Sequence, residues 1–345
     1  MEVPEYRLPD SAIAQEPVEP RDAARLLVSL AEDRDPTHLT VADLPGLLEP
    51  GDVLVLNTSR VLPARLRLSK STGGAAEVML VEPESDSGPG STVWRALVRP
   101  GRRLSPGTVL WAGERAAVEV GDRACDGSRQ VRLLLDERSE ASVAEFLARL
   151  GTIPLPPYIH QELADPERYQ TVYAADPGSV AAPTAGLHLS RAVLRRCRER
   201  GVTIAEVDLA VGLGTFRPVR VPRAEDHAMH AERYRVPSET LAACRQAARV
   251  VAVGTTTVRA LETAAATGQL SGETSLYIFG DFPFRLTDVL LTNFHQPRSS
   301  LLLLLEAFCG ARWRDLYAVA LDKGYRFLSF GDAMLVGRRK FPARR

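Results

Sequence analysis

The pattern of apolar residues changes once along this chain of 345 residues, and the change limits the folds that it can adopt. The first stretch carries short apolar runs separated by Gly, Pro, Ser and Asp, at 53–56, 64–68, 77–81, 93–98, 108–111, 116–120 and 130–135. Short strands with turns at this spacing are typical of a small antiparallel β-barrel. From residue 142 onward, helix-length and strand-length segments alternate instead, which indicates an α/β domain.

The ends of several expected helices are marked by capping residues. Ser142 followed by Glu145 is a possible capping box, and Gly201 and Gly310 stand where helices commonly end. We expect helices over 190–200, 238–249, 258–266 and 299–309, and strands over 207–211, 250–253, 289–292 and 325–336.

The order of these segments predicts the domain organisation. Residues 1–55 look mixed, as the C-terminal half does, so the β segment between them is expected to be an insertion. The predicted fold is a mixed α/β domain with an inserted small antiparallel β-barrel. The α/β domain comprises 1–60 and 152–345, and the barrel comprises 61–151.

The charge balance gives no global support for a nucleic-acid partner, because 43 basic residues are matched by 43 acidic ones. A nucleic-acid binder usually carries a basic excess. Contact with RNA would therefore depend on local patches, such as the arginines at 191–200, for which an ordinary solvated helix face is the alternative.

Several classes of protein are not expected. The four cysteines are far apart with no His at ligand spacing, so neither a metal site nor a disulfide framework is predicted. The first residues do not resemble a signal peptide, and the most apolar run, 301–309, is too short to span a bilayer. We expect a cytoplasmic protein with no membrane partner.

Polar residues follow three of the expected strands at the point where each strand ends. They are Asn57 and Arg60 after 53–56, Thr255, Thr256 and Arg259 after 250–253, and Asn293 after 289–292. Proteins of the α/β class bind ligands at the carboxyl ends of strands, and a helix start offers free amides to an anion. The plain alternatives are an exposed turn at Arg60 and simple helix capping by the threonines.

Histidines supply most of the candidates for acid/base chemistry. The string His227-Ala-Met-His-Ala-Glu has a spacing that suits proton transfer on a turn, with metal binding or a structural role as alternatives. His188 ends a run of small residues, which let a backbone approach a ligand closely, although a structural His in a tight loop is equally compatible. The four candidates are His188, His230, Glu232 and His295.

A glycine-containing turn follows the expected strand at 207–211. Its Gly212-x-Gly214 pattern can cradle a phosphate or a nucleoside. Pro218 follows and no helix begins there, so the dinucleotide-binding fingerprint is absent. We interpret the segment as a nucleoside-binding turn, with Phe216 available for stacking.

These strings together resemble the S-adenosylmethionine:tRNA ribosyltransferase-isomerase family of queuosine biosynthesis. The matching strings follow the family order: Leu8-Pro to Arg25-Leu-Leu, Gly51-Asp to Arg65, Pro154-Leu-Pro-Pro-Tyr-Ile, Tyr169-Gln-Thr-Val-Tyr, Ala181-Ala-Pro-Thr-Ala-Gly-Leu-His, Gly212-x-Gly-Thr-Phe-x-Pro-Val, His227-x-Met-His-x-Glu, Gly254-Thr-Thr-Thr-Val-Arg, Thr292-Asn-Phe-His and Tyr325-Arg-Phe to Met334. The resemblance covers the chain from its first residues to its last expected strand.

The resemblance implies a reaction. The aminomethyl group of 7-aminomethyl-7-deazaguanine in a tRNA anticodon loop acquires the ribosyl carbons of S-adenosylmethionine, giving epoxyqueuosine with release of adenine and methionine. S-adenosylmethionine is a co-substrate, and no cofactor or metal is implied. His188, His230, Glu232 and His295 are the expected catalytic residues. The expected substrate-binding residues are Asn57, Arg60, Thr184, Gly212, Gly214, Thr215, Phe216, Thr255, Thr256, Arg259, Asn293, Arg326 and Asp332.

Two other interpretations remain open. The chain has Asn57-Thr-Ser-Arg where the family usually has Asn-Asn-Thr-Arg, and it also departs from the family pattern at Gly280, Gln296 and Arg298. These departures, with the zero net charge, favour a member that uses the same donor on a non-tRNA amine or a small deazapurine. A non-catalytic RNA-binding protein is the third interpretation, and the retained His and Thr clusters argue against it.

Overall fold

The computed structural model describes residues 1–32, 34–84, 91–101, 104–136, 142–212 and 219–339. The chain forms two compact units: Met1–Ser59 with Pro156–Asp176 and Ala182–Arg345, and Arg60–Leu155 with Pro177–Ala181. The segment Pro177–Ala181 therefore groups with the second unit, although the sequence placed it in the α/β domain. The domain division drawn from the sequence, 1–60 with 152–345 around 61–151, stays a prediction.

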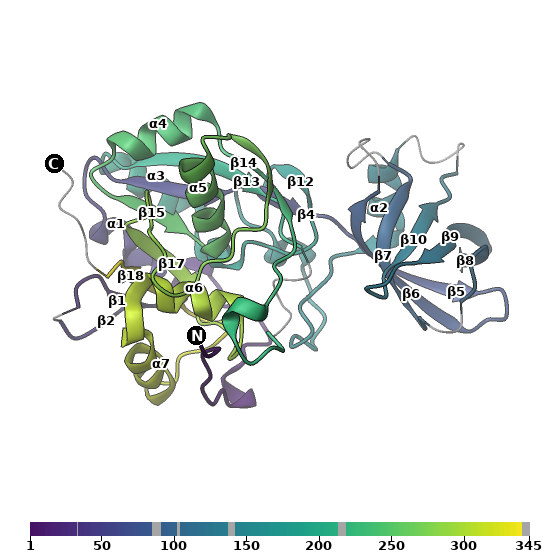
Figure 1. The fold of residues 1–345 in the computed structure, drawn as a ribbon, viewed down its shortest axis with the longest axis horizontal. Helices are drawn as coiled ribbons and strands as arrows, with labels where there is room; N and C mark the ends of the chain where they lie inside the picture. Colours follow the sequence, from purple (N-terminus) through teal and green to yellow (C-terminus); the bar gives the residue numbers. More distant parts are fainter. Residues whose placement is uncertain (33, 85–90, 102–103, 137–141, 213–218, 340–345) are drawn as a thin grey trace. The chain divides into compact units, whose positions relative to one another are not determined.

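The first unit is built on a nine-stranded mixed sheet (Figure 1). Its strands, in spatial order, are β16 (Ser271–Thr274), β14 (Glu232–Arg235), β13 (Thr203–Leu209), β3 (Val53–Asn57), β15 (Val250–Val253), β17 (Val289–Asn293), β18 (Ala333–Gly337), β1 (Arg25–Ser29) and β2 (Thr37–Thr40). β13, β3, β15 and β17 run parallel to one another, whereas β18 pairs antiparallel with β17. The carboxyl ends of four central strands therefore meet at one edge.

The α-helices described in this unit are α1 (Leu44–Leu47), α3 (Arg191–Glu199), α4 (Ser238–Gln246), α5 (Thr255–Thr267), α6 (Ser300–Cys309) and α7 (Trp313–Asp322). Four of them match segments expected from the sequence, whereas α1 and α7 were not expected. Serines begin two of them: Ser190 Oγ accepts from the Val193 amide at 3.1 Å, and Ser299 Oγ accepts from the Leu302 amide at 3.2 Å. These caps satisfy amides that have no partner within the helix.

Short 3₁₀ turns complete the first unit. They are η1 (Asp10–Ala12), η2 (Arg21–Ala23), η3 (Val41–Asp43), η5 (Pro166–Tyr169), η6 (Thr184–His188), η8 (Ala224–Asp226) and η9 (Gly310–Arg312). Three of them, η2, η5 and η6, carry candidate site residues. No helix among the described residues is both long and apolar enough to cross a membrane.

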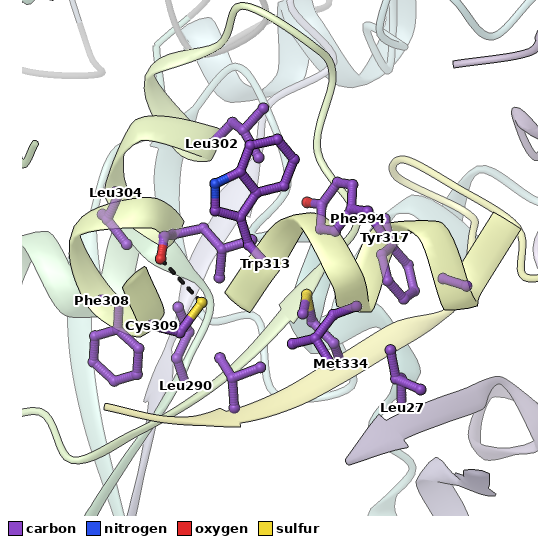
Figure 2. Packing of buried hydrophobic residues seen from close by; sticks show 14 of the residues in the cluster. Leu27, Leu290, Phe294, Leu302, Leu304, Phe308, Cys309, Trp313, Tyr317 and Met334 are labelled. Atoms are coloured by element: carbon purple, nitrogen blue, oxygen red, sulfur yellow. Dashed lines mark hydrogen bonds between the residues drawn. The ribbon is translucent and has the colours of Figure 1, made fainter. Parts of the chain in front are cut away.

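Alternate residues of the central strands face two separate cores. On β17, Leu290 belongs to one apolar cluster and Leu291 to the other, as the two-residue period of a strand requires. The first cluster lies with α6 and α7, and the second with α1 and α3. Figure 2 shows the first cluster, in which Trp313 and Tyr317 of α7 pack edge to face with ring centroids 5.2 Å apart. Burying a large apolar side chain of this kind contributes roughly 1.5–3 kcal/mol.

The second unit is a closed antiparallel barrel, as the sequence predicts. Its strands are β5 (Arg65–Lys70), β6 (Ala75–Pro83), β7 (Val93–Arg99), β10 (Arg129–Leu133), β9 (Arg115–Arg123) and β8 (Thr108–Ala112), and pairing of β8 with β5 closes the ring. β11 (Gly151–Thr152) extends it beside β5, after helix α2 (Val143–Leu150). A separate two-stranded sheet pairs β4 (Ser59–Val61) with β12 (Asp176–Ser179). The predicted fold class is therefore confirmed.

The expected final strand over 325–336 is wrong for most of its length, because β18 begins only at Ala333. The preceding residues form a loop around the Asp332 carboxylate. Its oxygens accept hydrogen bonds from the Arg326 amide at 2.8 Å and from the Arg25 amide at 2.9 Å. When a side chain accepts hydrogen bonds from backbone amides in this way, those amides do not pair with a neighbouring strand. The pattern of apolar residues in the sequence does not reveal such a side-chain contact.

We expect Gly331→Ala to destabilise this loop strongly. A Cβ at Gly331 would lie 2.4 Å from the Arg326 carbonyl oxygen and 2.5 Å from the Phe327 carbonyl carbon. Because backbone atoms cannot move aside as a flexible side chain does, the free energy of unfolding should fall by about 3 kcal/mol. Urea unfolding measures this, with Gly46→Ala as the control, since nothing lies within 4 Å of a Cβ there. Equal stability of the two variants would contradict the expectation.

Candidate active site

The candidate site lies at the edge where the central parallel strands of the first unit end. Asn57 is the last residue of β3 and Asn293 the last residue of β17, while Gly254 follows β15 and leads directly into α5. Neighbouring strands place these ends side by side, so their polar residues gather at one edge of the sheet. This is the arrangement that the sequence predicts.

Asn57 joins three elements at this edge. Its Nδ2 donates to the Leu209 carbonyl at 3.0 Å and to Thr256 Oγ1 at 3.2 Å, and its Oδ1 accepts from the Leu209 amide at 3.0 Å. Asn57 is fully buried, so both amide hydrogens are committed to the protein. The contacts fix the end of β13 and the start of α5 relative to β3.

Asn293 organises a second network that contains His188. Its Oδ1 accepts from Thr184 Oγ1 at 2.9 Å, and its Nδ2 lies 3.1 Å from His188 Nε2 and 3.2 Å from the Leu328 carbonyl oxygen. With Nδ2 donating toward the ring, His188 Nε2 accepts and the neutral imidazole carries its proton on Nδ1. The network therefore fixes one tautomer of His188.

His295 is held in a separate set of contacts two residues beyond β17. Its Nε2 lies 3.0 Å from Thr292 Oγ1, its backbone amide donates to the Tyr317 hydroxyl at 2.8 Å, and its carbonyl accepts from the Tyr6 hydroxyl. The residue is 6% exposed. His295 is thus tied to α7 and to the N-terminal segment.

Both buried histidines are neutral at physiological pH. Burial, and then the nearby charges of Arg326, Arg168 and Arg21, lower the pKa of His188 to about 4. Burial alone lowers the pKa of His295 to about 3. Neutral imidazoles of this kind can hydrogen-bond a substrate but do not carry a positive charge at pH 7.

These pKa values predict that acid weakens the fold. Below pH 6.5 the unfolded chain binds protons on both histidines, whereas the folded chain binds them only near pH 4 and pH 3. Stability is therefore complete above pH 6.5 and falls as the pH drops, by about 2 kcal/mol for each histidine by pH 5. Urea unfolding from pH 8 to 5 should show a shallower dependence for His188→Gln than for the wild type. An unchanged slope would contradict the assignment.

Glu232 and Arg259 form a buried ion pair. Arg259 Nη1 contacts Glu232 Oε2, and each side chain is only 6% exposed. Arg259 Nε also donates to the Leu276 carbonyl at 2.9 Å, and Nη2 donates to the Thr274 carbonyl at 3.3 Å. Glu232 Oε1 accepts from the Gly212 amide at 2.8 Å. The pair therefore holds the beginning of the glycine turn, and each nitrogen of the Arg259 guanidinium already has a protein partner.

A pocket opens beside the start of α5. It has an empty volume of about 340 Å³ and is lined by Met229, Thr255, Thr256, Arg259, Leu276, Tyr277, Ile278, Ser300, Leu301 and Leu304. Met229 belongs to the histidine-containing string, and His230 beside it is exposed. The Tyr277 ring lies 5.5 Å from the His227 ring. An apolar and aromatic lining next to a helix start suits a nucleoside with a charged tail.

A second pocket lies beside His188. It has an empty volume of about 220 Å³ and is lined by Pro17, Val18, Arg21, Arg168, Leu187, His188, Ser329 and Phe330. Arg21 and Arg168 were not selected from the sequence, whereas Ser329 was noted there beside Arg326 and Asp332. Arg21, Arg168 and Ser329 lie on η2, on η5 and in the loop before β18, so only the fold brings them together.

The remaining candidates chosen from the sequence lie in different parts of the chain. Arg326 and Asp332 lie in the loop before β18, where Asp332 accepts backbone hydrogen bonds. Arg60 lies on β4 in the second unit, and its contact with substrate stays a prediction. Gly214, Thr215 and Phe216 lie outside the described residues. Within those residues, no three His, Cys, Asp or Glu side chains are placed to hold a metal ion, and independence of metal stays a prediction.

Comparison with known proteins identifies the family. Residues 2–336 match the model of a family described as queuosine biosynthesis protein. The chain belongs to this family. The resemblance of the sequence strings to queuosine biosynthesis is therefore confirmed over nearly the whole chain.

Individual members of the queuosine biosynthesis family are similar over almost their full lengths. A protein of Rubrobacter xylanophilus named S-adenosylmethionine:tRNA ribosyltransferase-isomerase is 49% identical over 333 residues, which cover 96% of each chain. A Thermotoga maritima protein of the same name is 46% identical over 341 residues, covering 96% of this chain and 98% of the relative. A crystal structure described as S-adenosylmethionine tRNA ribosyltransferase from Thermotoga maritima aligns with a TM-score of 0.53 and 36% identity, covering 96% of this chain and 99% of that one.

Proposed function

We propose that this protein is an S-adenosylmethionine:tRNA ribosyltransferase-isomerase. It transfers and isomerises the ribosyl moiety of S-adenosylmethionine onto 7-aminomethyl-7-deazaguanine in tRNA, giving epoxyqueuosine and releasing adenine and methionine. The observation that carries the proposal is the near full-length similarity to enzymes of that name, at 44–49% identity. A member that uses a non-tRNA acceptor is not favoured by these names.

The pocket at the start of α5 is our choice for S-adenosylmethionine. Thr255 and Thr256 begin the helix there, and Tyr277 offers an aromatic surface. The glycine turn begins nearby at Gly212, whose amide donates to Glu232. The other carboxylate oxygen of Glu232 pairs with Arg259, which lines the pocket. The cationic sulfonium and the adenine would thus lie between an aromatic wall and the polar strand ends.

The chemistry needs a proton acceptor and a group that assists the departure of adenine. A proton leaves the carbon beside the sulfonium, and the substrate amine itself can take it. Adenine leaves more readily when its ring is protonated or hydrogen-bonded. We assign the hydrogen bond to adenine to the neutral His295, a hydrogen bond to the acceptor base to the neutral His188, and proton exchange with solvent to the exposed His230. Glu232 then acts as a positioning residue through its pairing with Arg259.

We place the acceptor base in the second pocket, beside His188 and Ser329. The tRNA would present it from the anticodon loop, splayed out of its stack as RNA bases are for recognition. Neither a metal nor a bound cofactor is needed for this reaction scheme. The proposed compartment is the cytoplasm, where tRNA and S-adenosylmethionine are both present.

Incubation with S-adenosylmethionine and an anticodon stem-loop carrying 7-aminomethyl-7-deazaguanine tests the proposal. We expect adenine release that depends on the RNA. The same stem-loop with guanine at that position is the control, because it lacks the aminomethyl nucleophile, and should release none. Adenine release that is equal with both RNAs would contradict tRNA as the acceptor.

A further inference from the structure

Two arginines line the second pocket beside His188 and a third lies next to it, and the proposed reaction does not yet use them. Arg21 comes from η2, Arg168 from η5, and Arg326 from the loop before β18. Arg21 and Arg168 line the pocket directly. Arg326 does not line the pocket, but its Nη1 donates at 3.1 Å to the carbonyl of Glu16, the residue before the lining residue Pro17. Its charge also lowers the pKa of His188. We call Arg168, Arg326 and the pocket around His188 the arginine pocket.

Arg21 serves the fold. Its Nη1 donates to the carbonyls of Gln170 at 2.8 Å and Leu187 at 3.3 Å, and its Nη2 donates to the Glu167 carbonyl at 3.0 Å. These bonds tie η5 to η6 and so hold one wall of the pocket. Arg21 contributes charge to the site, but its terminal nitrogens are engaged with the backbone.

Arg168 and Arg326 each have one terminal guanidinium nitrogen that makes no hydrogen bond among the described residues. Arg168 Nη2 donates to the Val18 carbonyl at 2.8 Å, and Arg326 Nη1 donates to the Glu16 carbonyl at 3.1 Å. In the part of the chain that the structure describes, Arg168 Nη1 and Arg326 Nη2 are buried and have no hydrogen-bond partner. A buried guanidinium nitrogen without a partner destabilises the folded chain. A ligand that supplies the missing acceptor would remove this cost.

The acidic groups nearby leave the arginine pocket positive. Glu19 pairs with Arg168 Nε, but its side chain is 66% exposed, so solvent weakens the pairing. Asp165 and Glu167 act on Arg21, whose guanidinium is held by backbone carbonyls. His188 adds no charge, because burial and the surrounding arginines lower its pKa to about 4. Asp332 is buried in the same loop as Arg326, but its two oxygens accept from the backbone amides of Arg326 and Arg25 and not from a guanidinium. The guanidinium groups of Arg168 and Arg326 can therefore still attract an anion.

We propose that the arginine pocket is an anion-recognition subsite, in which Arg168 Nη1 and Arg326 Nη2 bind carboxylate or phosphate oxygens of a substrate. The inference rests on the proposed function for the identity of the two substrates. It also resolves a difficulty, because Arg259, the arginine expected from the sequence to bind a carboxylate, is already paired with Glu232. The anion is either the methionine carboxylate of S-adenosylmethionine or a phosphate of the tRNA.

The first test uses inorganic phosphate alone, so it does not depend on the reaction. Phosphate should raise the Tm of the wild type in a saturable way, because it binds only the folded state. Arg168→Gln and Arg326→Gln should lose this rise. Arg314→Gln is the matched control, since the Arg314 side chain is 51% exposed on α7, and it should keep the rise. Equal rises in all four proteins, or none in the wild type, would overturn the subsite.

The second test identifies the source of the anion. If it is the methionine carboxylate, Arg168→Gln weakens S-adenosylmethionine binding by roughly 10- to 100-fold and leaves the affinity for the decarboxylated analogue unchanged. If it is a tRNA phosphate, stem-loop binding weakens instead, and the slope of log K against log salt falls by about 1. If neither affinity changes more than in Arg314→Gln, the subsite is excluded. If the wild type binds phosphate but neither substrate, the subsite stands and the proposed function fails.

Discussion

Replacing Arg259 with methionine is expected to lower the free energy of unfolding by about 3–5 kcal/mol. The substitution leaves the Glu232 carboxylate buried without its partner, and both side chains are only 6% exposed, so water cannot compensate. It also removes the hydrogen bonds to the Leu276 and Thr274 carbonyls. Urea unfolding at pH 7 measures the loss.

A double-mutant cycle separates the ion pair from the other contacts of Arg259. Glu232→Leu combined with Arg259→Met removes both charges, so it should cost clearly less than the sum of the single variants. Arg314→Met is the matched control, because Arg314 pairs with Glu306 at 3.3 Å while remaining 51% exposed, and should cost less than about 1 kcal/mol. A loss for Arg259→Met no larger than for Arg314→Met would show that the buried pair does not stabilise this region.

Replacing His188 with leucine is expected to reduce kcat by about 10²- to 10³-fold, as removal of one fixed hydrogen-bonding group does in other active sites. Asn293 holds the ring at 3.1 Å in a single tautomer, so the imidazole is positioned before substrate arrives. The measurement is RNA-dependent adenine release under saturating substrates.

Two further variants distinguish a role in the reaction from a role in the fold. His188→Gln keeps an acceptor for Asn293 Nδ2, so its thermal stability should approach that of the wild type while kcat stays low. His160→Leu alters an exposed histidine and should leave both quantities unchanged. If His188→Leu retained wild-type kcat, the assignment of His188 to the site would be wrong.

The sequence predicts which polar residues gather at one edge of the sheet, because the strand topology brings their strand ends together. Asn57, Thr256 and Asn293 follow apolar runs that can only be buried strands, and parallel neighbours bring their ends together. The barrel could be predicted for a related reason, since evenly spaced short strands with glycine and proline turns leave few other folds. Both inferences use patterns that are local in the sequence.

Features that depend on distant partners could not be predicted. Nothing in the strings containing Glu232 and Arg259 indicates that the two side chains neutralise each other across 27 residues. Arg168 likewise resembles any surface arginine until η5 is placed beside η6. The sequence predicts a strand for the loop before β18, because the pattern of apolar residues does not show that Asp332 accepts backbone hydrogen bonds there. In each case, contacts with residues distant in the sequence determine the role of the side chain.

The fate of the ribosyl carbons is the most direct measurement of the proposed function. The protein is incubated with S-adenosylmethionine labelled with ¹³C in the ribose and with the stem-loop that carries 7-aminomethyl-7-deazaguanine. Mass spectrometry of the digested RNA should show all the ribosyl carbons on that base, with one adenine and one methionine released for each modified base. Unlabelled RNA after adenine has been released, or transfer of the methyl group alone, would contradict ribosyl transfer to tRNA.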